Sequence, residues 1–107
     1  MIPEKTIEDL ISKHANIEKE LSSGSVDKKV FAEKSKEYSV LNEIIGDAKK
    51  YISFKSEKSE LQKILEDKSS DEELKKMAEK ELVNLELENE KNEKKLKLFL
   101  LPKDEAD

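Results

Sequence analysis

Apolar residues recur every three or four positions along most of this chain, which is the spacing of one face of an α-helix. The first apolar stripe stops at a polar segment in which Gly24 suits a left-handed helix end. The second begins after Asp27, a good N-cap residue, and meets no firm stop before Asp67. The third follows a short polar break and ends at Pro102. The pattern predicts three helices, over about residues 3–22, 27–67 and 70–101, and an all-α fold.

The apolar face of the second predicted helix is widest over residues 41–54. One set of positions there follows the alternating rhythm of a coiled-coil seam, and a second set lies beside it. We therefore expect the middle of this helix to contact two partners and its far end only one. Gly46 lies inside the stripe and weakens the helix, so a kink there is the alternative to a continuous helix. The two sets are Tyr38, Leu41, Ile45, Ala48 and Ile52, and Ile44, Tyr51, Phe54, Leu61 and Leu65.

A break of about three residues around Ser69 makes the second and third predicted helices antiparallel neighbours. Ser70 and Glu73 have the spacing of a capping box at the start of the third helix. Facing residues then have numbers that sum to about 139, as in Phe54 with Leu85 and Leu41 with Leu98. We expect an elongated, coiled-coil-like hairpin with the shorter first helix packed on it, in one domain over residues 1–101. Residues 102–107 are expected to begin a linker.

The composition supports long helices and argues against several kinds of site. Of the 107 residues, 44% are charged, only two are glycine, one is histidine and none is cysteine. This argues against a disulfide framework, a transition-metal site or a glycine-rich nucleotide loop. No apolar run approaches the roughly 18 residues of a membrane span, and no signal peptide is recognisable. We expect no cofactor, no metal, no small-molecule substrate, no membrane contact and a cytoplasmic location.

Three polar features favour structural roles over chemistry. His14 lies on the apolar stripe of the first helix without a second ligand near it, which favours a packed structural histidine. Asn89 and Asn92 interrupt the third stripe among glutamates, which favours a solvated segment over a buried pair that fixes the register. The many carboxylates of the third helix match its dipole, and a helical rod offers no dry cleft in which they could serve as an acid and a base.

Three stretches of the chain resemble the amino-terminal domain of bacterial class-I peptide chain release factors. Residues 35–41 read Ser-Lys-Glu-Tyr-Ser-Val-Leu, and residues 71–82 carry an acidic segment around Met-Ala-Glu-Lys-Glu-Leu. Residues 100–104, Leu-Leu-Pro-Lys-Asp, resemble the junction that leads into the decoding and catalytic part. This ending favours the type that reads UAA and UAG over the type that reads UAA and UGA.

The resemblance implies a role in translation termination without catalysis. The family's catalytic Gly-Gly-Gln loop is absent here, because the glycines stand alone at positions 24 and 46. Its implied partners are the stalk base of the large ribosomal subunit, both protein and rRNA, and the termination GTPase. Since the net charge is −5 and every basic residue is lysine, such a contact needs a local basic face. The candidates are Lys49, Lys50, Lys55 and Lys58 on the long helix, and Lys94, Lys95 and Lys97 near the end of the third.

Two other classes of function stay open. A helical arm of the seryl-tRNA synthetase kind would bind tRNA through a basic stripe along the hairpin, and the acidic third helix counts against it. A generic coiled-coil scaffold would show a self-complementary apolar patch and a stable oligomer. Neither class accounts for the Leu-Leu-Pro-Lys-Asp ending.

Overall fold

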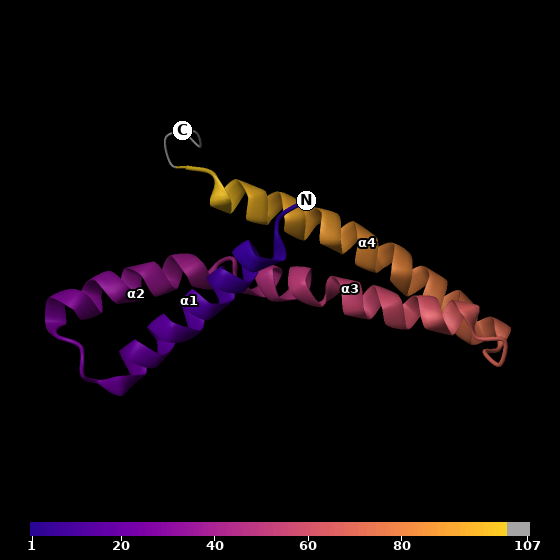
Figure 1. Cartoon of the computed structure of the whole chain (residues 1–107), viewed down its shortest axis with the longest axis horizontal. Helices are drawn as coiled ribbons and strands as arrows, with labels where there is room; N and C mark the ends of the chain where they lie inside the picture. The colour runs from indigo at the N-terminus through magenta and orange to yellow at the C-terminus, as the bar shows by residue number, and fades with distance from the viewer. Residues whose placement is uncertain (103–107) are drawn as a thin grey trace.

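The protein folds into two antiparallel helical hairpins that meet near the middle of the molecule (Figure 1). A computed structural model describes residues 1–102, and that part contains four α-helices and no strand. The expected all-α class is therefore confirmed, but the expected number of three helices is wrong. Most of the expected linker, residues 103–107, lies outside the described part. The helices are α1 (Glu4–Ser23), α2 (Lys28–Asn42), α3 (Ile45–Glu66) and α4 (Glu72–Leu100).

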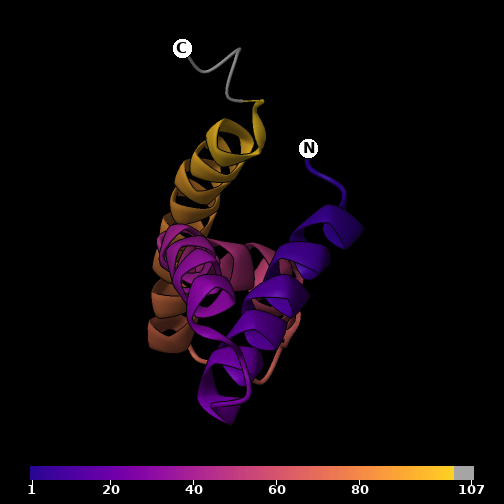
Figure 2. The same cartoon turned by 90° about the vertical axis from the view of Figure 1, so that its left-hand side faces the viewer.

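The shape is elongated, as expected. The molecule measures 60 × 35 × 20 Å, and its radius of gyration of 18.6 Å exceeds the roughly 13 Å of a compact chain of this length. The hairpin of α3 and α4 forms one long arm, and the hairpin of α1 and α2 extends to the opposite side (Figure 1). Seen from that side, α1 lies on one side of the view and α4 on the other, with α2 and α3 between them (Figure 2).

The helix expected over residues 27–67 is broken at residues 43 and 44. There the backbone amides of Glu43 and Ile44 donate to the carbonyls three residues earlier, at 3.3 and 3.0 Å, instead of four residues earlier. Ile44 leaves helical geometry with φ −110° and ψ −9°, and Gly46 follows in the first turn of α3. The tighter turn redirects the chain, so α2 packs on α1 while α3 packs on both α1 and α4. The side-chain pattern stays in phase across this short tightening.

The hydrophobic core lies where α1, the first half of α3 and the last third of α4 meet. The phenol oxygen of Tyr51 donates to the carbonyl of Ile2 at 3.2 Å and accepts from its amide at 3.1 Å, which fastens the N-terminal segment to α3. The wide apolar part of the second predicted helix therefore contacts two partners, as expected. The buried residues of this core are Ile2, Ile7, Ile44, Ala48 and Leu96, with Leu10, Ile11, Tyr51, Ile52 and Phe99 packed against them.

The hairpin of α1 and α2 is held by a histidine at its interface. The His14 ring is buried, stacks on Tyr38 with the ring centroids 4.7 Å apart, and lies with Nε2 3.1 Å from Oδ1 of Asn42. The expected structural histidine is thus confirmed. Gly24 ends α1 with φ 70°, and the Asp27 side chain accepts two backbone amides at the start of α2, as the sequence predicts.

The hairpin of α3 and α4 turns through Asp67, whose carboxylate accepts the Ser69 hydroxyl at 2.6 Å and the Ser69 amide at 2.9 Å. The N-cap of α4 is Asp71, one residue later than the expected Ser70, and its carboxylate accepts the Leu74 amide at 2.7 Å. Asp71 caps better in this position because an ionised carboxylate also complements the positive end of the helix dipole.

The predicted register between the long helices agrees with the structure at Phe54 and fails before the start of α3. Phe54 and Leu85 line the same hollow between α3 and α4, as expected for facing residues. The expected pair of Leu41 with Leu98 is wrong as a buried contact, because Leu98 is 65% exposed. Leu41 belongs to α2, which turns away from α4 at the break, so the facing rule stops at the start of α3.

Candidate functional site

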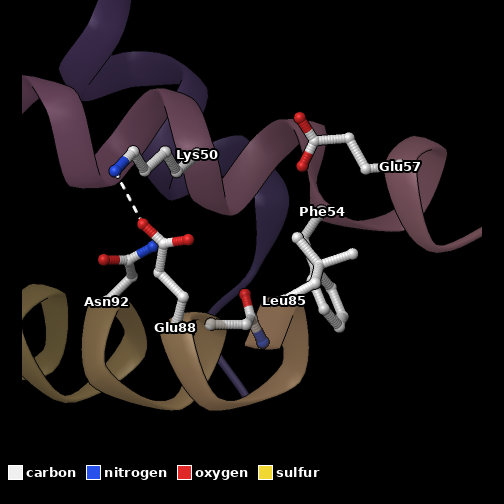
Figure 3. A pocket seen from close by; sticks show the side chains of 7 residues that line it. Lys50, Phe54, Glu57, Leu85, Glu88 and Asn92 are labelled. Atoms are coloured by element: carbon white, nitrogen blue, oxygen red, sulfur yellow. Dashed lines mark hydrogen bonds and ion pairs between the residues drawn. The ribbon is translucent and has the colours of Figure 1, made fainter. Parts of the chain in front are cut away.

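The seven candidate lysines lie on the two long helices, and four of them form ion pairs. Lys50 and Lys58 of α3 reach Glu88 and Glu86 of α4, at 2.7 and 3.4 Å. The structure therefore uses these two lysines to join α3 to α4, and Figure 3 shows the first of these bridges. The other two pairs are Lys55 with Glu4 of α1, at 3.6 Å, and Lys97 with Glu93 within α4, at 3.0 Å.

Two of these ion pairs, Lys50–Glu88 and Lys97–Glu93, shift the proton affinities of their members in the expected directions. The hydrogen bond from Lys50 lowers the pKa of Glu88, and the same bond raises the pKa of Lys50. The hydrogen bond from Lys97 likewise lowers the pKa of Glu93 and raises the pKa of Lys97. Because Lys50, Glu88 and Lys97 are more than half exposed and Glu93 is still a quarter exposed, each bridge fixes geometry more than it stabilises the fold.

Three candidate lysines keep their charge available to a partner. Within residues 1–102, no carboxylate oxygen lies within 4.0 Å of the ammonium groups of Lys49, Lys94 or Lys95. All three side chains belong to exposed residues, one on α3 and two adjacent on α4. The structure therefore does not gather the seven lysines into one basic face. It divides them into four that form bridges and three that do not.

A hollow of about 140 Å³ opens beside the Lys50–Glu88 bridge (Figure 3). Asn92 lines it and is buried, at 6% exposure, so the expected solvated segment is wrong at this residue. The neighbouring Asn89 also lines the hollow, and its buried Oδ1 has no hydrogen-bond partner among the described residues. Asn92 stands four residues before the buried Leu96, on the face of α4 that meets α3. Helical spacing of this kind could have indicated its burial from the sequence.

A larger hollow of about 510 Å³ lies farther along the interface of α3 and α4. Its four glutamates are exposed to solvent, so the hollow holds no desolvated pair of carboxylates for acid–base chemistry. Its lining residues are Glu57, Glu60, Leu61, Ile64, Glu81, Asn84, Leu85 and Glu88.

Two further searches of residues 1–102 bear on the kinds of site. No three side chains of histidine, cysteine, aspartate or glutamate gather there in a way that could hold a metal ion. Of the four helices in that part, none combines the length and the apolar character that a bilayer crossing requires.

Comparison with known proteins assigns the chain to a family. The family model described as the PCRF domain matches residues 10–107. The chain belongs to the PCRF domain family. A curated relative named "Peptide chain release factor 1", from Pelagibacter ubique, is 73% identical over all 107 residues of this chain and 30% of its own length. Relatives of the same name from Rickettsia canadensis and Rickettsia felis are 38% and 36% identical over 98 residues, which is 92% of this chain and 27% of theirs.

The resemblance to class-I release factors is thereby confirmed, and these relatives are of the release factor 1 type that the ending of the sequence favoured. The PCRF-domain chain spans less than a third of the length of these relatives. No solved structure matches it.

The sequence interpretation predicted the pair of Lys97 with Glu93 within α4, but it missed the carboxylates of other helices that neutralise Lys50, Lys55 and Lys58. Glu88 lies opposite Lys50 in the predicted register, since their numbers sum to within one of 139. The partner of Lys55, Glu4, lies on α1, whose placement on α3 the sequence pattern does not specify. The first partner could therefore have been found from the sequence, and the second could not.

Proposed function

We propose that this chain is the amino-terminal helical domain of a peptide chain release factor of the type that reads UAA and UAG, and that it acts in translation termination by docking. The proposal rests on one observation, the 73% identity over the whole chain to a relative named "Peptide chain release factor 1". Codon reading and peptidyl-tRNA hydrolysis belong, in this proposal, to the remaining part of such a factor. The domain itself contributes contact and not catalysis, and it works in the cytoplasm.

The docking partner is the stalk base of the large ribosomal subunit, with the termination GTPase close by. An elongated domain of 60 × 35 × 20 Å suits this role, because it exposes long faces at a distance from its own core. With a net charge of −5, the domain does not attract RNA over its whole surface, so a ribosomal contact must combine protein with a restricted basic patch.

Among the seven candidate lysines, the unpaired three support such a patch best. A phosphate that approaches Lys49, Lys94 or Lys95 meets a free ammonium group, whereas one that approaches Lys50 must first displace Glu88 at 2.7 Å. Glu88 would then remain beside the phosphate and repel it. We therefore place the basic part of the contact on Lys94 and Lys95 of α4, with Lys49 of α3 as a further contributor.

Binding of the chain to isolated large ribosomal subunits tests this proposal. Affinity is measured at about 50 mM and about 200 mM salt for the parent, for Lys94→Gln with Lys95→Gln, and for Lys50→Gln as the matched control. The double variant should bind more weakly and with a salt slope smaller by about one per lost phosphate contact, while the control keeps the parental slope.

Failure of the parent chain to bind large subunits at either salt concentration would refute docking. A double variant with the parental slope would instead show that the basic contact lies elsewhere. Transfer RNA serves as a competitor in the same assay. If added tRNA displaces the chain from the subunits, the result would favour the tRNA-arm function over release-factor docking.

A further inference from the structure

The solvent-facing side of α4 carries a continuous stripe made only of lysine and apolar residues. Its members recur at intervals of three and four residues, and all of them are exposed. The buried residues of α4 are Ala78, Asn92 and Leu96. At about 100° of rotation per residue the stripe lies on the opposite side of the helix, away from α3. This outer stripe consists of Lys76, Lys80, Val83, Leu87, Lys91, Lys94 and Leu98.

The outer stripe has an ordered composition. Two lysines, Lys76 and Lys80, precede an apolar centre, and two more, Lys91 and Lys94, follow it. Val83 and the next apolar residue of the centre, Leu87, are 57% and 53% exposed. From first lysine to last the stripe spans about 27 Å along the helix axis.

The charges of the outer stripe are not used by the fold. Within the part of the chain that the structure describes, none of its four lysines has a carboxylate oxygen within 4.0 Å. Lys76 and Lys80 are separated by four residues, and Lys91 and Lys94 by three, so each pair places like charges side by side. Such pairs slightly destabilise a helix, and an acidic partner would relieve the repulsion.

We propose that the outer stripe docks an amphipathic α-helix of another protein, one that presents a short apolar patch between two acidic groups. Charge complementarity identifies the acidic ends, and the exposed Val83 and Leu87 identify the apolar middle. Nucleic acid fits this face less well, because a phosphate backbone makes no use of the apolar centre. The acidic residues along one flank of the outer stripe, such as Glu79 and Glu90, would also repel it. The two proposals share Lys94, but the test below changes Lys76, Lys80 and Leu87, which the ribosomal docking proposed above does not use.

A synthetic peptide tests the outer stripe without ribosomes. The probe is a helical peptide of about 20 residues, matched to the 27 Å stripe, with leucines at its centre and glutamates toward both ends. A scrambled peptide of the same composition is the first control. Fluorescence anisotropy at low salt measures the binding of each labelled peptide to the 107-residue chain and to its variants.

Two variants of the outer stripe and two matched controls separate charge from apolar contact. Lys76→Glu with Lys80→Glu reverses one basic end, and Leu87→Ser removes the apolar centre. Lys63→Glu on α3 and Val40→Ser on α2 make the same kinds of change at exposed positions elsewhere. We expect the stripe variants to raise the Kd about tenfold and the controls to change it less than about twofold. Circular dichroism confirms that each variant is folded.

Three results would overturn the proposal. The designed and scrambled peptides could bind equally well, which would show that the stripe recognises no helix. A duplex RNA of about 20 base pairs could bind more tightly than the peptide and lose affinity in the Lys76 and Lys80 variant, which would assign the stripe to nucleic acid. Light scattering could show a dimer that Leu87→Ser dissociates, which would assign it to a second copy of this chain.

Discussion

Replacing Leu96 by alanine is the sharpest test of how the helices meet. Leu96 is fully buried in the core that α1, α3 and α4 form together. The substitution removes three carbon atoms, which at about 0.8 kcal/mol each corresponds to about 2.4 kcal/mol of lost transfer free energy. The cavity left behind adds to this value, because the three helices are fixed to one another and cannot fully close around it.

We therefore expect Leu96→Ala to lower the free energy of unfolding by about 3 kcal/mol, within the usual 2–5 kcal/mol for this change. A chain of this size has a total stability of about 5–15 kcal/mol, so the variant should stay folded but melt at least about 12 °C lower. Urea and thermal unfolding followed by circular dichroism measure both quantities.

Leu98→Ala is the matched control, two residues along the same helix. Leu98 is 65% exposed, so its loss should change the free energy of unfolding by no more than about 0.5 kcal/mol. Equal effects of the two substitutions, or a Leu96→Ala variant within about 1 kcal/mol of the parent, would refute the packing of α4 on α1 and α3 described above.

Three further predictions concern the backbone and the charges. Gly24→Ala should lower the free energy of unfolding by about 1 kcal/mol because φ is 70° there. Gly46→Ala has open space around the new Cβ and should raise the free energy of unfolding by up to about 1 kcal/mol. Urea titrations in which both substitutions change the stability in the same direction would contradict this. Asp71→Ala should lower the free energy of unfolding by about 1 kcal/mol because it removes the α4 cap, and Asp71→Asn should restore most of the loss. Urea titrations in which Asp71→Ala is as stable as the parent would show that the cap contributes nothing. The pKa of Glu88 lies below its ordinary 4.5 because Lys50 donates to it, so the stability that the bridge contributes is complete above about pH 4.5 and is lost as the pH falls through the folded-state pKa. Thermal melts between about pH 3 and about pH 7 should show a smaller acid-induced drop for Glu88→Gln than for the parent, and equal drops would exclude a role for the bridge.

Helical periodicity and one short turn were enough to predict the elongated, antiparallel arrangement and the position of the core. The wide apolar face over residues 41–54 marks the place where α1 and α4 both contact the middle of the chain. The break at Glu43 and Ile44 could not be predicted in the same way. It replaces two hydrogen bonds without shifting the phase of the side chains, so a broken and a continuous helix have nearly the same apolar pattern. The break accompanies the packing of α2 on α1. That packing is a tertiary contact between two helices, which the apolar pattern of one helix does not specify.

The burial of a polar residue was predicted correctly from its position on a helix face and wrongly from the residues adjacent to it in sequence. His14 was placed by its position on an apolar stripe, and it is buried against Tyr38. Asn92 was judged by the glutamates beside it in sequence, although its distance of four residues from Leu96 places it on the buried face. In a helix the residues three and four positions away determine the environment of a side chain, and adjacent residues do not.

The charge that a partner meets differs from the charge that the composition suggests. A net charge of −5 describes the whole chain, but Lys50, Lys55 and Lys58 are each occupied by a carboxylate of a neighbouring helix. The fold thus neutralises lysines at its helix interfaces and leaves others exposed on the outer side of α4. Salt should therefore affect the paired lysines at the helix interfaces and the exposed lysines of α4 differently. It weakens the internal bridges with little effect on stability, because exposed pairs contribute little, and it weakens binding to an anionic partner strongly, because several free lysines act together there.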